Sequence, residues 1–462
     1  MASNGLRPED VVVLMVPFPL HGHLNQLLHL SRLISAHDVA VHYVGTAAHN
    51  RQARRRIHGW NPLSISNIFF HDQFPSLSFQ SSFPSRPQPL FDASSALRQP
   101  VAELLRYLCA INRRVVVIYD SLMGSVVQDF VKFPNAESYT FHSVSAYTIF
   151  FFLWEKTGRP FAIDKEILEN LPSLEGCFSP EFVKFVGNQH QYMKLNSGRI
   201  YNTCRVVESP FLELLAKPEI SGNKKQWALG PFNPVGAESV ERKKPSSNSD
   251  SRHRCLKWLD RQGPNSVILV SFGTTTTLSD KQLQELATGL EKSQQKFVWV
   301  LRDADGANFF GREIKRVELP KGFEERVKKR GMVVRDWAPQ LEILGHSATG
   351  GFMSHCGWNS CMESISMGVP IAAWPMHSDQ PRNTILITKV LKIGLAVKDW
   401  ARRDELVKSS AVESAVARLM TSEEGAEMRK RAAELSGSVR KAVAKGGVTH
   451  LELDSFITHI TR

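Results

Sequence analysis

The stretch WAPQLEILGHSATGGFMSHCGWNSCMESISMGVPIAAWPMHSDQ, from Trp337 to Gln380, places a short apolar run, a tight polar turn and a helical pattern in direct succession. The run Gly350–Ser354 predicts a buried strand, and the turn His355–Ser360 leads into the expected helix. Such a turn offers backbone N–H groups without helical partners, together with the positive end of the helix dipole. The stretch therefore predicts an anion site at the end of a strand, suited to a diphosphate.

Side chains in the same turn extend this prediction. His355, Asn359 and Ser360 would add hydrogen-bond donors, and Gly357 lets the backbone come close to a ligand. Ser360 and Glu363 also fit a capping box, in which Glu363 would reach back to the start of the helix. The competing interpretation is that Glu363 binds a ribose, because a carboxylate can accept from two vicinal hydroxyls. Both interpretations stay open at this level.

Strands and helices alternate on both sides of this stretch. The expected strands are Val11–Val16, Val39–Val44, Val115–Tyr119, Ser138–His142, Val267–Phe272, Phe297–Leu301, Met332–Trp337, Gly350–Ser354 and Ile371–Trp374. The expected helices include Leu24–Ile34, Leu97–Leu108, Asp280–Lys292 (capped by Ser279 and Gln282), Asp404–Met420, Ala426–Ala444 and Thr449–Thr461. This alternation predicts an α/β protein built on two doubly wound parallel sheets that face a cleft.

A polar segment divides the chain. Residues 236–253 contain almost no apolar side chain, which is typical of a linker. We expect an N-terminal domain over residues 1–235 and a C-terminal domain over 254–445, joined by this linker. The last helix, residues 446–462, is expected to pack back on the N-terminal domain.

Composition limits the cellular setting. The 462 residues are 42% hydrophobic and 22% charged, which is ordinary for globular domains. No secretory signal and no apolar run long enough to span a membrane is evident. The six cysteines are scattered, unlike a disulfide framework, so we expect a reduced, cytoplasmic protein. Oligomeric state has no readable signature.

The net charge of +12 raises the question of nucleic-acid binding. Basic residues gather in residues 51–56 and 242–244. However, zinc-finger spacing, aromatic-interleaved RNA-binding motifs and basic heptads are all missing from the sequence. A solvated basic surface is the favoured interpretation, and no nucleic-acid partner is expected.

The stretch Trp337–Gln380 resembles the signature box of plant family 1 UDP-sugar-dependent glycosyltransferases, which have the two-domain GT-B fold. The likeness includes the opening WAPQ, the central HCGWNS, the glutamate three residues later and the final DQ. It extends over nearly the whole chain. The resemblance implies that the N-terminal domain, residues 1–235, binds the acceptor and that the C-terminal domain, residues 254–445, binds the UDP-sugar. The resemblance implies that UDP-glucose, a co-substrate, is bound by Thr274, Trp337, Ala338, Gln340, His355, Trp358, Asn359, Ser360, Glu363, Asp379 and Gln380.

Each of these residues has an implied contact. Trp337 would stack on uracil, with Ala338 and Gln340 at the edge of the base, and Glu363 would hold the ribose. Thr274 would touch the phosphates from the side opposite His355, Trp358, Asn359 and Ser360. Asp379 and Gln380 would bind sugar hydroxyls, and a final glutamine is similar to that of glucose-using members.

Glycosyl transfer also needs a base for the acceptor hydroxyl. The resemblance implies His23, in Gly22-His23-Leu24, oriented by Asp120 at the end of a buried strand. His23 would lie in the first turn of a helix, where the dipole favours a neutral imidazole. His21 would be a neighbour rather than the base. A helix N-cap is the competing interpretation of Asp120.

No metal or other cofactor is expected. Asp303 and Asp305 imitate a cation-binding DxD motif but are expected to be solvated loop residues, and the histidines and cysteines lack paired zinc spacing. A helix N-terminus can stabilise the leaving diphosphate without metal.

The stretch HGHLNQLLHLS is close to the zeatin O-glucosyltransferases, cytokinin-modifying enzymes of plants, because Gln26 stands where many relatives have proline. The resemblance implies transfer of glucose to the side-chain hydroxyl of zeatin with inversion, giving an O-β-glucoside. A likeness to grass enzymes points to cis-zeatin. The alternatives are a phenolic or flavonoid acceptor, and a catalytically silent sugar-nucleotide-binding protein.

Overall fold

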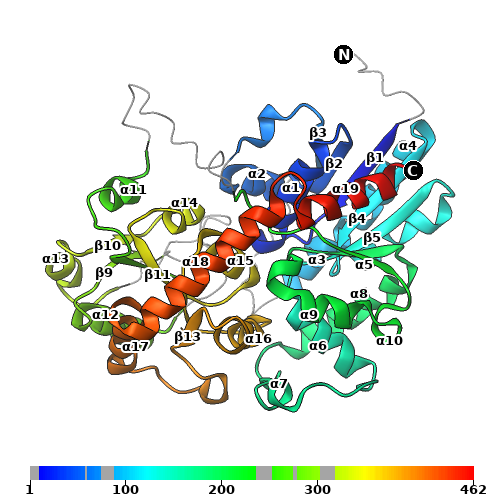
Figure 1. The fold of residues 1–462 in the computed structure, drawn as a ribbon. Coiled ribbons are helices and arrows are strands. Elements are labelled where there is room, and N and C mark those ends of the chain that lie inside the picture. The colour runs from blue at the N-terminus through cyan, green and yellow to red at the C-terminus, as the bar shows by residue number, and fades with distance from the viewer. Residues whose placement is uncertain (1–9, 58–59, 74–87, 236–251, 274–277, 302–317) are drawn as a thin grey trace. The chain divides into compact units, whose positions relative to one another are not determined.

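The computed structural model describes residues 10–57, 60–73, 88–235, 252–273, 278–301 and 318–462. The chain forms two compact units (Figure 1). The first comprises Met1–Pro160, Ser179–Pro234 and Ala442–Arg462, and the second comprises Phe161–Phe178 and Val235–Lys441. Of the predicted linker, residues 236–251 lie outside the described part of the chain.

The described part of the first unit contains a seven-stranded parallel sheet in the order β3-β2-β1-β4-β5-β6-β7. Its strands are β1 (Val11–Val16), β2 (Ala40–Thr46), β3 (Ile68–Gln73), β4 (Arg114–Asp120), β5 (Ala136–His142), β6 (Gly198–Tyr201) and β7 (Lys225–Ala228). The four strands predicted for this half of the chain are confirmed within two residues at each end. β3, β6 and β7 were not predicted, because β3 ends in the polar residues His71, Asp72 and Gln73, and β6 and β7 are only four residues long and contain polar residues.

Both faces of this sheet are buried. In β1, Val13 and Met15 pack into one apolar core while Leu14 and Val16 pack into another. Side chains of a strand alternate between faces, so a strand covered on both sides becomes a continuous apolar run. This is why the Val-rich segments were recognisable as strands.

The helices of the first unit are α1 (His21–Ser35), α2 (Ala47–Arg56), α3 (Gln88–Ala96), α4 (Arg98–Ile111), α5 (Gly124–Val127), α6 (Ala146–Lys156), α8 (Pro180–His190), α9 (Arg205–Ala216), α10 (Pro218–Ser221) and α19 (Val448–Thr461), with 3-10 turns η1 (Pro62–Ser64), η2 (Gln128–Lys132) and η3 (Gln191–Leu195). α1 follows β1 directly. It therefore begins at the edge of the sheet where the parallel strands end.

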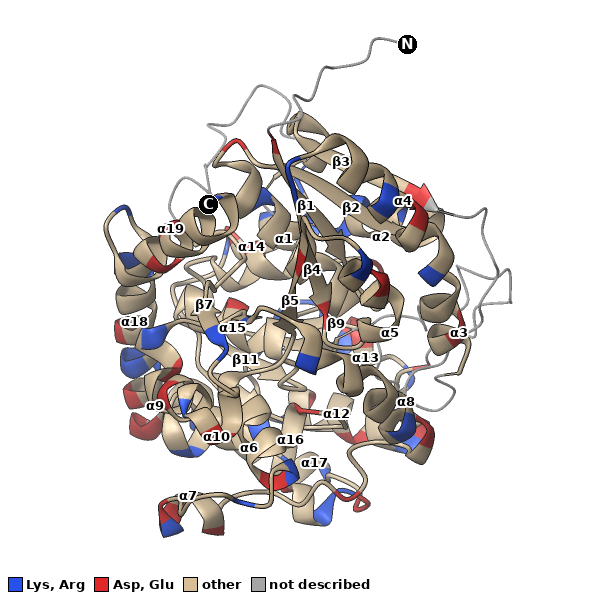
Figure 2. Cartoon of the chain, turned by 90° about the vertical axis from the view of Figure 1, so that its right-hand side faces the viewer, with Lys and Arg blue, Asp and Glu red and all other residues tan. Residues whose placement is uncertain are grey.

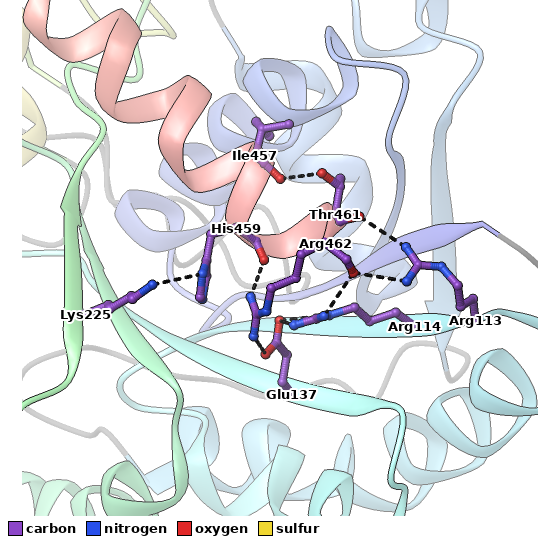
Figure 3. Close-up of polar contacts among 8 residues, drawn as sticks. All are labelled: Arg113, Arg114, Glu137, Lys225, Ile457, His459, Thr461 and Arg462. Carbon is purple, nitrogen blue, oxygen red and sulfur yellow. Dashed lines mark hydrogen bonds and ion pairs between the residues drawn. The ribbon is translucent and has the colours of Figure 1, made fainter.

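The last helix, α19, packs into the core on one face of this sheet, and its C-terminus lies beside the start of β4. Phe456 is fully buried, with its ring 5.5 Å from that of Tyr139 and 5.1 Å from that of Trp227. The guanidinium of Arg113 donates to the backbone oxygens of Thr461 and Arg462 at 3.1 and 3.0 Å (Figure 3). A cation placed at helix carbonyls also complements the negative end of the helix dipole.

The described part of the second unit contains a six-stranded parallel sheet in the order β10-β9-β8-β11-β12-β13. Its strands are β8 (Val267–Ser271), β9 (Lys296–Val300), β10 (Gly331–Val334), β11 (Thr349–Ser354), β12 (Ile371–Ala373) and β13 (Gly394–Ala396). The predicted strand at Met332–Trp337 ends early, at Val334, so Trp337 lies in a loop. The α/β class with two doubly wound parallel sheets is confirmed.

The helices of the second unit are α7 (Lys165–Glu169), α11 (Arg254–Leu259), α12 (Asp280–Lys292), α13 (Phe323–Val327), α14 (Gln340–Leu344), α15 (Trp358–Met367), α16 (Gln380–Ile385), α17 (Ser409–Thr421) and most of α18 (Glu423–Val443), with the π-helical segment η5 (Leu386–Val390) and the 3-10 turn η6 (Trp400–Arg402). α17 begins five residues later than predicted. Ser279 caps α12 by accepting the N–H of Gln282 at 3.2 Å. The reciprocal half of the predicted capping box is wrong, because the carboxamide of Gln282 bonds to both backbone groups of Val407 instead.

Charges of both signs share the helices. In Figure 2, Lys and Arg lie beside Asp and Glu on α8, α9 and α18. In the basic segment of α2, Arg54 pairs with Asp72 at 3.4 Å and lies over the ring of Phe70. The second basic segment, residues 242–244, lies outside the described residues. Among the described helices, none is long and apolar enough to cross a membrane.

Replacing Phe456 with alanine is expected to lower the free energy of unfolding of the first unit by about 3–5 kcal/mol, because it removes a buried aromatic ring from the α19 interface. The midpoint of urea unfolding, followed by tryptophan fluorescence, measures the change. Leu451→Ala is the control, since Leu451 lies on the same helix with 57% of its surface exposed and should change stability by less than about 0.5 kcal/mol. Equal effects of both variants would contradict the proposed docking.

Candidate active site

His23 and Asp120 meet at the edge of the first sheet where β1 and β4 end. His23 lies in the first turn of α1, and Asp120 is the last residue of β4. The two strands are parallel neighbours, with Val16 paired to Tyr119, so the segments that leave them start side by side. His23 Nδ1 lies 2.7 Å from Asp120 Oδ2.

The surroundings of this pair define its chemistry. Asp120 is fully buried, and its other oxygen, Oδ1, accepts the N–H of Leu122 at 3.0 Å. A carboxylate needs a donor, so the proton of the neutral imidazole belongs on Nδ1, which leaves Nε2 as the acceptor nitrogen. The side chain of His23 is 16% exposed, and the ring of Phe18 lies edge-on at 5.3 Å. Such an arrangement has the geometry that an oriented general base requires.

The competing interpretation of Asp120 as a helix cap is wrong. The following helix, α5, begins at Gly124 with Met123 in the cap position. The bond to the N–H of Leu122 is instead a local turn that fixes the plane of the carboxylate. One oxygen is thereby held by the backbone while the other faces His23.

His21 has a different environment. Its Nε2 lies 3.5 Å from the amide nitrogen of Asn25, one turn further along α1, and that amide also donates to the backbone oxygen of Arg56. The structure thus brings His23, and not His21, within hydrogen-bond distance of Asp120.

In the second unit, the turn between β11 and α15 presents a helix N-terminus. α15 begins at Trp358. Its cap residue is Gly357, which has no side chain that could bond the N–H groups of the first turn. Its first turn contains no acidic residue and includes Trp358, Asn359 and Ser360. Backbone N–H groups at this end, together with the helix dipole, are suited to an anion.

His355 lies directly before this helix end and is closely enclosed. A Cβ atom on Gly273 would lie 2.8 Å from its ring, and one on Gly357 would lie 2.5 Å from Nε2. Only glycine fits at these two positions. Burial, followed by the effect of His377, lowers the pKa of His355 to about 3, so its imidazole is neutral at physiological pH. Its Nδ1 has no hydrogen-bond partner among the described residues.

Gln340 connects the WAPQ segment to α15. Its Nε2 donates to Ser360 Oγ at 3.0 Å and to Glu363 Oε2 at 2.7 Å. The capping-box interpretation of Ser360 and Glu363 is therefore wrong, because both side chains are engaged by Gln340 and the helix begins before them. Burial raises the pKa of Glu363 to about 7, although the bond from Gln340 opposes this shift.

Trp337, Ala338 and Asp379 are further residues predicted to bind the donor. Trp337 is 36% exposed, with the ring of His253 edge-on at 6.3 Å, while Ala338 behind it is buried. The carboxylate of Asp379 accepts from Asn383 Nδ2, which also donates to the backbone oxygen of Cys356. Asn383 thereby ties Asp379 to the turn that holds His355.

Gln380 is buried and internally bonded. Its Oε1 accepts the N–H groups of Met376 and His377 at 2.8 and 3.1 Å, and its Nε2 lies 3.5 Å from His377 Nδ1. The oxygen is thus occupied by the loop before α16. Any contact to a ligand would be made by the nitrogen.

Some predicted residues cannot be placed. Thr274, Asp303 and Asp305 lie outside the described residues. Within the described ranges, no group of three or more His, Cys, Asp or Glu side chains is arranged to hold a metal ion. The sequence interpretation missed the roles of Gly273 and Asn383. For Asn383, the spacing of four residues from Asp379 on a helix was an available signal.

Comparison with known proteins places these features in a family. Residues 9–234 match the model described as "Glycosyltransferase, N-terminal domain", and residues 208–427 match "UDP-glucoronosyl and UDP-glucosyl transferase". The chain is 56% identical to a zeatin O-glucosyltransferase of Phaseolus lunatus, over 98% of this chain and 97% of that protein. It is 53% identical to a zeatin O-xylosyltransferase of Phaseolus vulgaris, over 98% of each.

More distant relatives share the architecture. A cis-zeatin O-glucosyltransferase of Zea mays is 41% identical over 98% of this chain and 99% of its own length. Among solved structures, a UGT transferase from Siraitia grosvenorii in complex with UDP superposes with a TM-score of 0.76 at 27% identity, covering 98% of this chain and all of that one. A UDP-glucosyltransferase from Polygonum tinctorium gives 0.79 at 26% identity, with 99% of both chains covered. The fold is therefore GT-B.

The raised pKa of Glu363 predicts that the free energy of unfolding depends on pH. The ordinary carboxyl value is 4.5, so between about pH 4.5 and 7 the folded state keeps a proton that the unfolded state has released. The contribution of Glu363 to the free energy of unfolding therefore falls as the pH rises through this range, and the loss is complete above it. Glu363→Gln should remove this part of the slope in urea unfolding.

A second variant checks the cause. Gln340→Ala removes the hydrogen bond that opposes the pKa shift and should extend the falling slope to higher pH. Identical pH profiles for the wild type and Glu363→Gln would contradict the assignment.

Proposed function

The chain belongs to the UDP-glucoronosyl and UDP-glucosyl transferase family, and we propose that it transfers glucose from UDP-glucose to the side-chain hydroxyl of zeatin. The product would be an O-β-glucoside formed with inversion. The observation that carries the proposal is the 2.7 Å contact between His23 Nδ1 and Asp120 Oδ2. The choice of zeatin is supported by relatives named as zeatin O-glycosyltransferases, which are 56% and 53% identical over 98% of this chain.

His23 would act as the base. Its Nε2 would take the proton of the acceptor hydroxyl while that oxygen attacks C1 of glucose. The bond from C1 to the diphosphate breaks, and UDP leaves with the electron pair. Asp120 would stabilise the imidazolium that forms, since its carboxylate already faces Nδ1. Base catalysis of this kind contributes roughly 10²- to 10⁴-fold.

The second unit would bind the donor. The exposed face of Trp337 suits stacking on uracil, and Glu363 suits the ribose hydroxyls. The N-terminus of α15 would stabilise the diphosphate as its charge develops, with Thr274 as a further phosphate contact. Asp379 and Gln380 would bind the sugar. Because this helix end can stabilise the leaving group, we propose that no metal is required.

The proposal also specifies the zeatin isomer, the transferred sugar and the cellular location. The relative from Zea mays supports cis-zeatin as the preferred isomer, whereas the two relatives from Phaseolus have names that specify no isomer. Glucose is proposed over xylose on the basis of the 56% identical relative, a zeatin O-glucosyltransferase. We place the activity in the cytoplasm.

The direct test is a substrate panel. Purified protein would be incubated with UDP-glucose or UDP-xylose and with cis-zeatin, trans-zeatin, a flavonol or indoxyl as acceptor. Formation of a zeatin O-glucoside supports the proposal. Glucosylation of the phenolic acceptors alone would reassign the acceptor, and UDP binding without any transfer would indicate a catalytically silent protein.

Two histidine variants separate the candidate bases. His23→Ala is expected to lower kcat by roughly 10²- to 10⁴-fold with UDP affinity unchanged, because the base is lost while the donor site is intact. His21→Ala is the matched control from the same turn and should keep most of the activity. The reverse result would make His21 the base.

A further inference from the structure

The start of helix α1, which carries His23, lacks the usual local stabilisation. Its cap residue, Leu20, makes no side-chain hydrogen bond, and its first turn contains no acidic residue. Local sequence therefore does little to hold this end of the helix. Its position must be set by tertiary contacts.

One such contact is a buried relay of carboxamides through Gln26. The N–H of Phe232 donates to Asn202 Oδ1 at 3.0 Å. Asn202 Nδ2 donates to Gln26 Oε1 at 3.0 Å, and Gln26 Nε2 donates to the backbone oxygen of Ser143 at 3.2 Å. Both side chains are at least 96% buried.

The direction of this relay is determined at both ends. A backbone N–H can only donate and a backbone carbonyl can only accept, so each carboxamide has a single orientation that satisfies its neighbours. The relay joins α1 to the segments that follow β5, β6 and β7, all at the edge of the sheet where the strands end. Gln26 lies three residues after His23 and therefore on the same face of the helix.

We propose that Gln26 is a positioning residue of the transfer reaction, whose carboxamide holds the first turn of α1, and thereby His23, in register with the ends of β5 and β6. This inference rests on the proposed function, in which His23 is the base. Gln26 does not touch the reacting atoms in this assignment. It acts through the placement of the His23 imidazole relative to the acceptor hydroxyl, and a displacement of about 1 Å can cost roughly 100-fold in rate.

Gln26→Glu breaks the relay at a defined point. The carboxylate can still accept from Asn202 Nδ2, but it cannot donate to the oxygen of Ser143 and opposes it electrostatically. When the new carboxyl is protonated, its O–H can donate to that oxygen and restore the relay. The effect of the substitution should therefore reverse as the pH falls.

The chain offers a matched control at the opposite edge of the same sheet. Asn135, directly before β5, donates through Nδ2 to the backbone oxygens of Cys109 and Asn112 at 2.9 and 3.0 Å. Asn135→Asp makes the same chemical change beside backbone carbonyls. It should lower the stability of the same unit without moving His23.

Kinetics of the full chain with UDP-glucose and zeatin provide the first readout. We expect kcat of Gln26→Glu to fall about 10- to 100-fold near pH 8, with the KM for UDP-glucose within about twofold of wild type. The ratio of variant to wild-type kcat should rise toward unity near pH 5. Gln26→Leu should stay low at every pH, and Asn135→Asp should keep a flat ratio near unity.

Hydrogen exchange provides a second readout that needs no substrate. At matched pH, amides of residues 20–27 should exchange faster in Gln26→Glu than in the wild type, and this difference should shrink near pH 5. A wild type inactive on every zeatin would defeat the proposed function, yet this exchange pattern would still test the relay. Asn202→Asp, which loses the donor to Gln26 but keeps the acceptor for Phe232, is the second variant if Gln26→Glu does not fold.

Two results would overturn the inference. One is wild-type kcat at every pH in folded Gln26→Glu and Gln26→Leu proteins. The other is an equal loss of kcat in Asn135→Asp at equal stability, which would show that any weakening of the unit has the same effect.

Discussion

The parallel alignment of the strands is the constraint on which both candidate sites depend. Because β1 and β4 run in the same direction, the turn that carries His23 and the carboxylate of Asp120 leave the sheet at the same edge. Pairing in the opposite direction would bring Asp120 beside Val11, about 17 Å away along the strand. The second sheet obeys the same rule, since His355 follows β11 while Gly273, which packs on its ring, follows β8.

Burial then decides which groups can carry charge in the donor site. The low pKa of His355 keeps its imidazole neutral, so it cannot neutralise a diphosphate by charge. In the proposed donor site that task would fall on the N-terminus of α15, where backbone N–H groups keep their polarity at every pH. Glu363 is the opposite case, because its raised pKa makes it a group that titrates near neutrality. The arrangement favours hydrogen bonding to a ligand over direct charge pairing.

The strands were predictable where burial produces a continuous run of apolar residues in the sequence, and they were missed where it does not. Val11–Val16 and the other central strands are apolar runs because both faces of each sheet are covered. β7 and β13 were missed because they are short and contain polar residues or glycine. The capping box at Ser360 and Glu363 was a reasonable local interpretation, but Gln340, twenty residues earlier, engages both side chains. No local pattern reports such a contact.

Gln26 shows how a residue can be conspicuous in sequence while its role is visible only in three dimensions. Its two hydrogen-bond partners are 117 and 176 residues away. A buried carboxamide is costly unless both of its ends are satisfied, and an apolar group of similar shape can be nearly as stable when its partners are also replaced. Stability alone therefore gives little reason for a glutamine here. A directional relay, in contrast, fixes the position of α1 in a way that apolar packing cannot, and that helix carries His23, the proposed base.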